Sequence, residues 1–258
     1  MSGGYYQYTD EMYQNFGYLA SWAPNTILRL GDVGILRDRI FELETTLSEL
    51  NIPFTVRTDA TPADYEYISS NAVSIKFKAA GEVPSIGSSL SQADAGISIN
   101  FDDADAIVFQ ALHCEITSIL GLDNLGREII SRYENGDWSK NRVIVTDLIT
   151  SKSATILISS GHDGQIELAA NSNIGLNQFK IANAGVNFRV VNSSKIGTRI
   201  IAAENLTPLF KASGIKKQLL RKPTFVRRSE SQDVQPSSLN ESTKPVSSLS
   251  EVTYDDVY

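Results

Sequence analysis

The chain has 258 residues, of which 41% are hydrophobic and 21% charged, and its formal net charge at pH 7 is −7. A chain of this size and composition can bury a sizeable core, so we expect one main domain. Its sequence has no run of about 18 apolar residues that could cross a bilayer as a helix, no signal-peptide pattern at its start, and a single cysteine, Cys114, which excludes an internal disulfide. We therefore expect a cytoplasmic protein.

Basic side chains are concentrated near the C-terminus. Residues 205–228 carry no Asp or Glu and seven basic side chains: Lys211, Lys216, Lys217, Arg221, Lys222, Arg227 and Arg228. The flanking stretches are acidic, with net charges of −9 for residues 1–204 and −5 for residues 229–258. Coulomb attraction allows such a segment either to be held by its own chain or to bind an anionic partner.

The first sixty residues favour helices with short strands between them. Met12, Tyr13 and Phe16 fall at helical spacing, and Gly17 follows, which predicts a short helix ending near Tyr18. Apolar residues at spacings of three and four predict a second helix over Asp38–Leu50. The other elements expected here are a strand at Ile27–Leu30, a strand at Phe54–Arg57 and one helical turn at Thr61–Asp64.

From Ala72 onward the apolar period changes from helical to alternating. Val73–Ala79 and Ile97–Phe101 alternate apolar and polar residues, as half-exposed strands do, and the Gly- and Ser-rich residues 81–94 between them read as a long loop. A further strand is expected at Ala106–Phe109. Asp123 can cap a helix that stops at Asn135-Gly136.

The second half of the chain carries the longest β signal. Val143–Ile149, Ala154–Ser159 and Gln165–Ala169 are separated by short polar segments and predict an antiparallel meander. Later elements are a hairpin of Val186–Val190 with Thr198–Ala202, a closing strand at Leu206–Phe210, and a short basic helix that contains Ile215, Leu219 and Leu220.

The expected fold is α+β, with a twisted, mainly antiparallel sheet and helices packed on it. The domain is expected over residues 1–220. Residues 221–258 are basic, then acidic and rich in serine, with few apolar side chains to offset the entropy of ordering, so we expect a disordered tail.

Reactive side chains are few and scattered. His113, Cys114 and Glu115 are adjacent, but neighbours in a strand point to opposite faces, so they do not act together, and a buried cysteine is the simpler interpretation. His162 lies in a Gly-Asp-rich turn whose chemistry explains it. Two histidines and one cysteine offer no zinc-ligand spacing.

Other chemical motifs are incomplete. Asp102, Asp103 and Asp105 could gather a cation, but they lack the spacing of a calcium loop, and a solvated hairpin tip is the preferred interpretation. The Gly-rich stretches lack the Lys-Ser or Lys-Thr ending of a phosphate loop. We expect no enzyme activity, no cofactor and no metal.

The basic segment allows three interpretations. It can be a helix whose lysines simply solvate its outer face. Nucleic acid is disfavoured, because Phe225 is the only aromatic residue among the clustered charges and the chain is acidic overall. Anionic lipid suits a short cluster better, at about 1 kcal/mol for each basic residue near the membrane surface.

One ordered series of features spans roughly residues 70–220. A strand at Val73–Gly81 leads into a loop with Val83-Pro84, and an amphipathic strand follows at Ala95–Phe101. The later features are a helix with Ile129 and Tyr133, Trp138 leading into Val143–Asp147, a strand at Phe188–Val190 and a closing basic stretch. This order resembles the pore-forming domain of the gasdermins, especially the compact bacterial members. The N-terminal cysteine that bacterial gasdermins commonly carry for lipidation is absent.

The resemblance implies a latent pore-forming protein that acts in cell death or defence. Such a protein stays inactive while a C-terminal segment is bound, and it self-assembles on anionic lipid at the inner face of the cell membrane after a protease removes that segment. We assign lipid binding to the seven basic residues from Lys211 to Arg228, and an inhibitory role to Glu251, Asp255 and Asp256.

Two other functions remain open from the sequence. One is a non-enzymatic protein-interaction module with the Ser-rich tail as a regulatory segment. The other is a hydrolase that uses His113 or His162.

Overall fold

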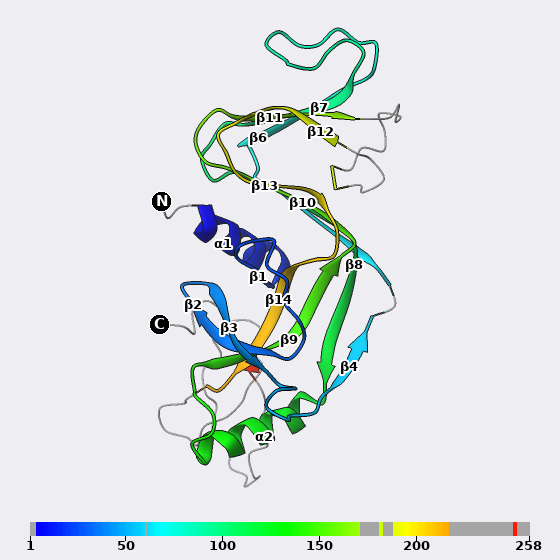
Figure 1. Cartoon of the computed structure of the whole chain (residues 1–258). Helices are drawn as coiled ribbons and strands as arrows, with labels where there is room; N and C mark the ends of the chain where they lie inside the picture. Colours follow the sequence, from blue (N-terminus) through cyan, green and yellow to red (C-terminus); the bar gives the residue numbers. More distant parts are fainter. Residues whose placement is uncertain (1–3, 60, 171–180, 183–187, 217–249, 252–258) are drawn as a thin grey trace, which may run out of the picture. The chain divides into compact units, whose positions relative to one another are not determined.

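The structure is a computed structural model that describes residues 4–59, 61–170, 181–182, 188–216 and 250–251. Strand pairs within these residues are antiparallel wherever the register is defined, and two helices accompany them (Figure 1). The structure thus confirms the expected α+β class with a mainly antiparallel sheet. Of the expected disordered tail, all but Ser250–Glu251 lies outside the described residues.

The helices are α1 (Gly4–Phe16) and α2 (Leu122–Glu134). The strands of the first half are β1 (Leu19–Ala20), β2 (Asp32–Arg37), β3 (Ile40–Thr46), β4 (Thr55–Thr58), β5 (Ala63–Ile68), β6 (Val73–Lys78), β7 (Ala95–Phe101) and β8 (Ile107–Leu120). Those of the second half are β9 (Arg142–Ser151), β10 (Ser153–Ser159), β11 (Gly164–Ala170), β12 (Phe188–Ser194), β13 (Ile196–Ala203), β14 (Leu206–Gly214) and β15 (Ser250–Glu251).

The chain divides into two compact units, each built from separate stretches of sequence. Unit 1 comprises Met1–Ile27, Asp59–Ile116 and Ile149–Leu209, and unit 2 comprises Leu28–Thr58, Thr117–Leu148 and Phe210–Tyr258. Strands β8, β9 and β14 have residues in both units. The expected single domain over residues 1–220 stays a prediction.

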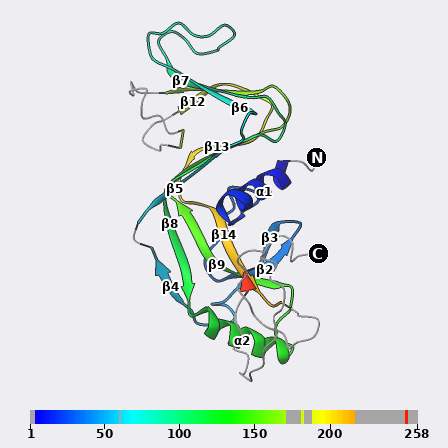
Figure 2. The same cartoon turned by 180° about the vertical axis from the view of Figure 1, so that it is seen from behind.

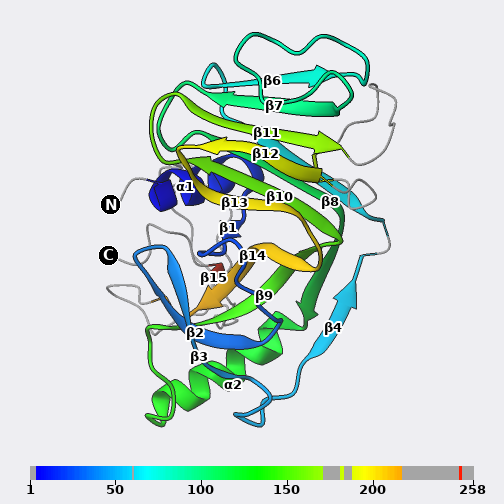
Figure 3. The same ribbon diagram turned by 45° about the horizontal axis from the view of Figure 1, so that its top comes forward.

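Unit 1 contains two groups of paired strands. In the first, β12, β11, β7 and β6 follow one another side by side (Figure 3). In the second, β10 pairs with β8 and β13, and β5 pairs with β8. Apolar side chains of both groups meet in one cluster, in which Ile99, Phe101 and Leu157 are fully buried. This shared core fixes the position of the β6–β7 hairpin within unit 1.

Helix α1 also belongs to unit 1 and packs on its strands. Figure 2 shows the helix beside strands of this unit. Tyr8 and Met12 are fully buried in a cluster that includes Phe109 and Ile156. The helix ends where expected: Gly17 has φ +68° and its N–H donates to the carbonyl of Tyr13 at 2.8 Å. A left-handed glycine after the last helical residue is a common helix stop.

Unit 2 is organised around α2. Leu125 and Ile129 of this helix are buried with Val33, Trp138 and Ile144. The predicted stop at Asn135-Gly136 is confirmed. The predicted cap is wrong: the helix follows Gly121, in a left-handed conformation, without a side-chain cap, and Asp123 lies in the first turn.

The predicted helix over Asp38–Leu50 is wrong, because this segment forms the turn and second strand, β3, of a hairpin and then a further turn. Asp38 and Arg39 both have positive φ, 47° and 67°, as a tight two-residue hairpin turn requires, and they join β2 to β3. The helical spacing of the leucines was coincidental, since Leu43 is 58% exposed whereas Leu47 is buried beyond the end of β3. The neighbouring strand expected at Ile27–Leu30 is not formed, and β2 takes its place.

The strands of the predicted meander are confirmed, but their pairing is wrong. The two edges of β10 are occupied by β8 and β13, and those of β11 by β7 and β12. All seven residues of β10 are buried, and a strand buried on both faces gains from two partners in the middle of a sheet. The predicted hairpin of Val186–Val190 with Thr198–Ala202 is also wrong, because β12 pairs with β11, and β13 with β10.

Three shorter predictions met different outcomes. The strand at Phe54–Arg57 is confirmed as β4, whereas the helical turn expected at Thr61–Asp64 is wrong because β5 starts at Ala63. Ile215 of the expected basic helix directly follows β14, and Leu219 and Leu220 lie outside the described residues.

Gly34 tests the packing of the β2–β3 hairpin. A Cβ added there would overlap the carbonyl oxygen of Glu42 and lie 2.9 Å from Cζ of Phe41. We expect Gly34→Ala to lower the free energy of unfolding by about 2 kcal/mol or more, measured by denaturant unfolding. Gly161→Ala is the matched control, because its nearest neighbour would be Lys195 Cδ at 3.7 Å; equal stability of the two variants would contradict the hairpin packing.

Candidate functional site

The C-terminal segment of the chain is paired with the last long strand of unit 2. Ser250 and Glu251 form β15, in antiparallel register with Gly214 and Ser213 of β14. The side chain of Ser213 is buried on β14 and lies 3.3 Å, oxygen to oxygen, from the hydroxyl of Thr146 on β9. The strand that receives the C-terminal segment is therefore itself fixed in the core of unit 2.

The predicted lipid-binding residues begin at this same edge. Lys211 lies within β14 and Lys216 two residues after it, and both are half-buried. The other five residues of the predicted set, Lys217, Arg221, Lys222, Arg227 and Arg228, lie outside the described residues. Of the predicted inhibitory residues, Glu251 belongs to β15, and Asp255 and Asp256 lie outside the described residues. β15 thus pairs with the strand that contains Lys211, and the assignment of lipid binding and inhibition to these residues stays a prediction.

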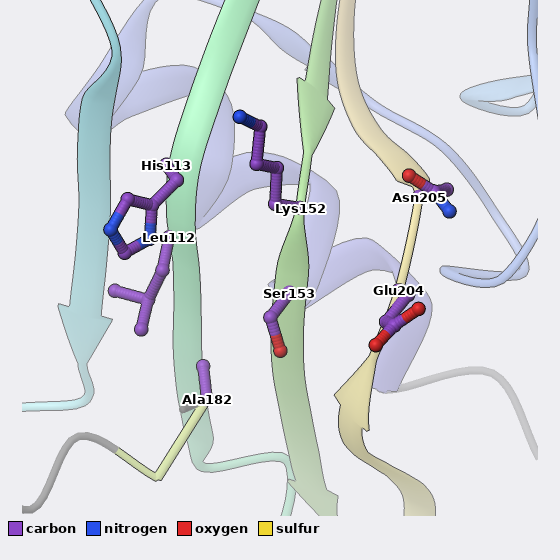
Figure 4. Close-up of a pocket in the computed structure, with 7 residues that line it drawn as sticks. All are labelled: Leu112, His113, Lys152, Ser153, Ala182, Glu204 and Asn205. Carbon is purple, nitrogen blue, oxygen red and sulfur yellow. The ribbon is translucent and has the colours of Figure 1, made fainter. Parts of the chain in front are cut away.

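A pocket of about 400 Å³ in unit 1 gathers several polar residues (Figure 4). Its lining comprises Leu112, His113, Lys152, Ser153, Ala182, Glu204 and Asn205. The imidazole of His113 points away from Ser153 and Glu204, and the ammonium group of Lys152 points away from both as well. The labelled side chains therefore do not converge as a nucleophile, a base and an acid would have to.

The backbone around this pocket is irregular for a local reason. His113 adopts φ +51° inside β8, and the register between β5 and β8 shifts at this position. The N–H of His113 donates to Oδ1 of Asp64 at 2.8 Å, so a side chain replaces the missing ladder partner. This arrangement is a β-bulge, and it explains Asp64 as a partner of β8 rather than as part of a helical turn.

Cys114 is buried, whereas the adjacent His113 is exposed. The cysteine is fully buried in the core of unit 1, and this burial raises the pKa of its thiol to about 11, although a hydrogen bond with Ser151 acts in the other direction. A thiol with this pKa has little thiolate at neutral pH and is a poor nucleophile. The structure thus agrees with the interpretation of Cys114 as a buried core residue.

The inertness of Cys114 can be measured directly. At about pH 8 a pKa of about 11 leaves roughly one thiol in a thousand ionised, so we expect iodoacetamide to leave the folded protein unlabelled and to label it once it is unfolded. Leu43→Cys, which places a thiol at an exposed position, serves as a positive control. Rapid labelling of the native wild-type chain would refute the buried placement.

His162 and the three aspartates predicted as a hairpin tip lie together. Nδ1 of His162 is 3.2 Å from the carbonyl oxygen of Asp102 and 3.6 Å from Oδ1 of Asp103. The side chains of His162 and Asp103 are both largely exposed. The N–H of Asp105 donates to the carbonyl of Ser159. Within the described residues no group of three or more His, Cys, Asp or Glu side chains could hold a metal ion.

Two buried charged side chains hold the long loop between β6 and β7. The ammonium group of Lys78 donates to the backbone carbonyls of Ala79, Gln92 and Asp94 at 3.2, 3.2 and 2.7 Å, and Lys78 is only 8% exposed. Both ends of the loop are therefore tied to one cation.

The second buried charge is Glu167 of β11, which is fully buried. Its carboxylate accepts hydrogen bonds from the N–H of Ser89 in the loop at 2.7 Å and from the hydroxyl of Ser98 on β7 at 2.8 Å. Burial by itself raises the pKa of Glu167, but the hydrogen bonds of Ser88, Ser89 and Ser98 outweigh it and hold the pKa below its ordinary value. The ionised form thus ties the middle of the loop to the neighbouring strand.

Between these anchors the loop exposes apolar side chains. Val83 is 81% exposed and Ile86 is completely exposed. Gly87 has φ +86°, and the N–H of Ser88 donates to the carbonyl of Ser85 at 3.0 Å, so Ile86 occupies the corner of a type II turn. The sequence predicts the loop and its Val83-Pro84, but the exposed Ile86 was not predicted, although an isoleucine between serine and glycine in a loop is a signal for it.

The anchoring by Glu167 predicts a specific pH dependence. A carboxylate whose folded-state pKa is depressed adds stability above its ordinary value of 4.5, and this contribution is lost as the pH falls through the lower folded-state value. Glu167→Gln should therefore lower Tm at neutral pH and flatten the fall in Tm below pH 4.5, as followed by circular dichroism. Glu134→Gln, at an exposed position of α2, is the control, and parallel curves for Glu167→Gln and wild type would contradict the anchoring.

Comparisons with known proteins identify no family. Among the described residues, neither helix has the length and apolar character needed to cross a bilayer. No protein-family model matches the chain. No curated protein is significantly similar to it.

Proposed function

We propose that this chain is a latent pore-forming protein whose C-terminal segment holds it inactive and whose release lets it act on anionic membranes. The observation that carries the proposal is the pairing of Ser250–Glu251 with Ser213–Gly214 of β14. Ser250 and Glu251 thus pair with the strand that contains Lys211, the first residue of the basic segment. The resemblance to the gasdermins supports the same function.

The pairing has the properties of a releasable contact. It comprises two residues on each strand, so its own hydrogen bonds contribute little, about 1 kcal/mol each. While the chain is intact, residues 217–249 tether β15 to β14, which keeps the local concentration of the segment high. After a cut in this stretch, the short strand would dissociate, because a few hydrogen bonds of about 1 kcal/mol each do not offset its gain in translational freedom.

Release would change both the edge and the charge of unit 2. The edge of β14 at Ser213–Gly214 would lose its partner, and an unpaired edge is a template for pairing with another strand, as self-assembly requires. After a cut between residues 229 and 249, the seven basic residues from Lys211 to Arg228 would also be separated from the acidic side chains of the released piece, which include Glu251, Asp255 and Asp256. Their attraction to anionic lipid would then be less opposed within the chain.

An inserted protease site tests the proposal. A site for a specific protease is placed between residues 229 and 249, and the full chain is incubated with dye-loaded vesicles of phosphatidylcholine and phosphatidylglycerol before and after cutting. We expect leakage only after cutting, and it should fall strongly at high salt because basic residues attract the anionic lipid. A variant with a scrambled site is the matched control.

A charge-neutralised variant separates lipid contact from release. Replacing all seven basic residues by glutamine should abolish leakage of the cut protein while β15 still dissociates, as size-exclusion chromatography would show. Equal leakage from intact and cut protein, or none from either, would overturn the proposed function. Binding of a protein strand at the vacated edge without any leakage would instead favour the interaction module.

A further inference from the structure

The tip of the β6–β7 loop, in unit 1, exposes large apolar side chains to solvent. Val83 and Ile86 stand out from it at 81% and full exposure, and Pro84 lies between them. Residues 83–93 include no charged side chain. Isolated apolar residues on a surface are ordinary. Here, however, two of them lie at the end of an uncharged eleven-residue stretch, so their transfer from water to an apolar phase requires no desolvation of a charge within that stretch.

The base of the loop is built to hold this tip in place. Lys78 ties the two loop ends through three backbone carbonyls, and Glu167 holds Ser89. Leu90 is 4% exposed and packs against the backbone at Gly96. A tip that is already ordered loses little conformational entropy when it binds, which favours a preformed contact surface.

From these observations we propose that the tip, Val83 to Gly87, is a membrane anchor that inserts into the interfacial region of a lipid bilayer. The occupant follows from the size and chemistry of the tip. A stable protein interface needs about 800 Å² from each partner, more than two protruding side chains supply, whereas a bilayer requires no complementary shape. The uncharged serines beside the tip can hydrogen-bond to lipid headgroups and water at that depth.

This inference rests on the proposed function for its target, a membrane, but it does not need cleavage or a pore. It also gives the two surfaces different roles. The basic residues from Lys211 to Arg228 would attract the protein to anionic lipid through charge, and the uncharged tip would enter the bilayer through apolar transfer. Insertion of the tip, once the protein is bound, should therefore be insensitive to salt.

A fluorescent probe at the tip tests the anchor. Ile86→Cys is labelled with the polarity-sensitive dye NBD in the full chain that carries the inserted protease site, and the buried Cys114 leaves the new thiol as the reactive one. Vesicles of phosphatidylcholine and phosphatidylglycerol are added before and after cutting. We expect a blue shift and a severalfold rise in emission on vesicle binding. NBD on Leu43→Cys, an exposed residue of unit 2, is the matched control and should not respond.

An unlabelled variant measures the contribution of the tip to binding. Ile86→Asp should weaken vesicle binding in a flotation assay about tenfold, because an exposed apolar side chain is replaced by a charge, and Leu43→Asp should bind as the wild type does. Both substitutions are at exposed positions, so folding should be preserved, which circular dichroism can confirm.

The outcomes separate the anchor from the proposed function. Leakage after cutting without any response of the probe at residue 86 would overturn the anchor and leave the pore intact. A response without leakage would support the anchor and remove the pore. Failure of the protein to bind vesicles in either state, or equal binding by Ile86→Asp and wild type, would overturn the anchor.

Discussion

The pairing of β10 on both edges is the constraint on which the architecture of unit 1 depends. Every residue of this strand is buried, and Ile156 and Leu157 point to opposite faces, each contributing about 1.5–3 kcal/mol of burial. Two-sided burial requires layers on both faces: Ile156 contacts the cluster that holds α1, and Leu157 the cluster that holds β7 and β11. Strand β7, which follows the exposed loop, and strand β11, which carries Glu167, pack against Leu157. The position of the loop within unit 1 therefore depends on β10.

Two charged side chains buried in the described part of unit 1, Lys78 and Glu167, hold the loop between β6 and β7. Each is bound by several hydrogen-bonding groups of the loop and the neighbouring strands. Leaving a buried ion without such partners is costly, so these hydrogen bonds oppose any conformation of the loop that would break them. The same interactions that stabilise the fold therefore determine which side chains of the loop face solvent.

The proposed function joins two surfaces of different physical character. The β14 edge in unit 2 offers backbone hydrogen bonds and adjoins a basic segment, while the loop tip in unit 1 offers apolar area without charge. Long-range attraction and short-range insertion are separate contributions to membrane binding, and one responds to salt while the other does not. In a protein that carries both surfaces, membrane binding can be controlled through the charge attraction without any change in the apolar tip.

The sequence by itself determined the class of most elements, the charge segregation and the isolation of its reactive residues, since these follow from local pattern and composition. Alternation identified β6 and β7, apolar runs separated by polar turns identified β9, β10 and β11, and glycine placed the ends of α1 and α2. Only the tertiary structure decided that Asp38–Leu50 contains the second strand, β3, of a hairpin, that β10 lies between β8 and β13, and that β15 pairs with β14. Those outcomes depend on which distant strand offers a free edge and a matching apolar face, and no local pattern contains that information. The exposure of Ile86 likewise depends on the tertiary structure, because Lys78 and Glu167 hold the loop in the conformation that exposes it.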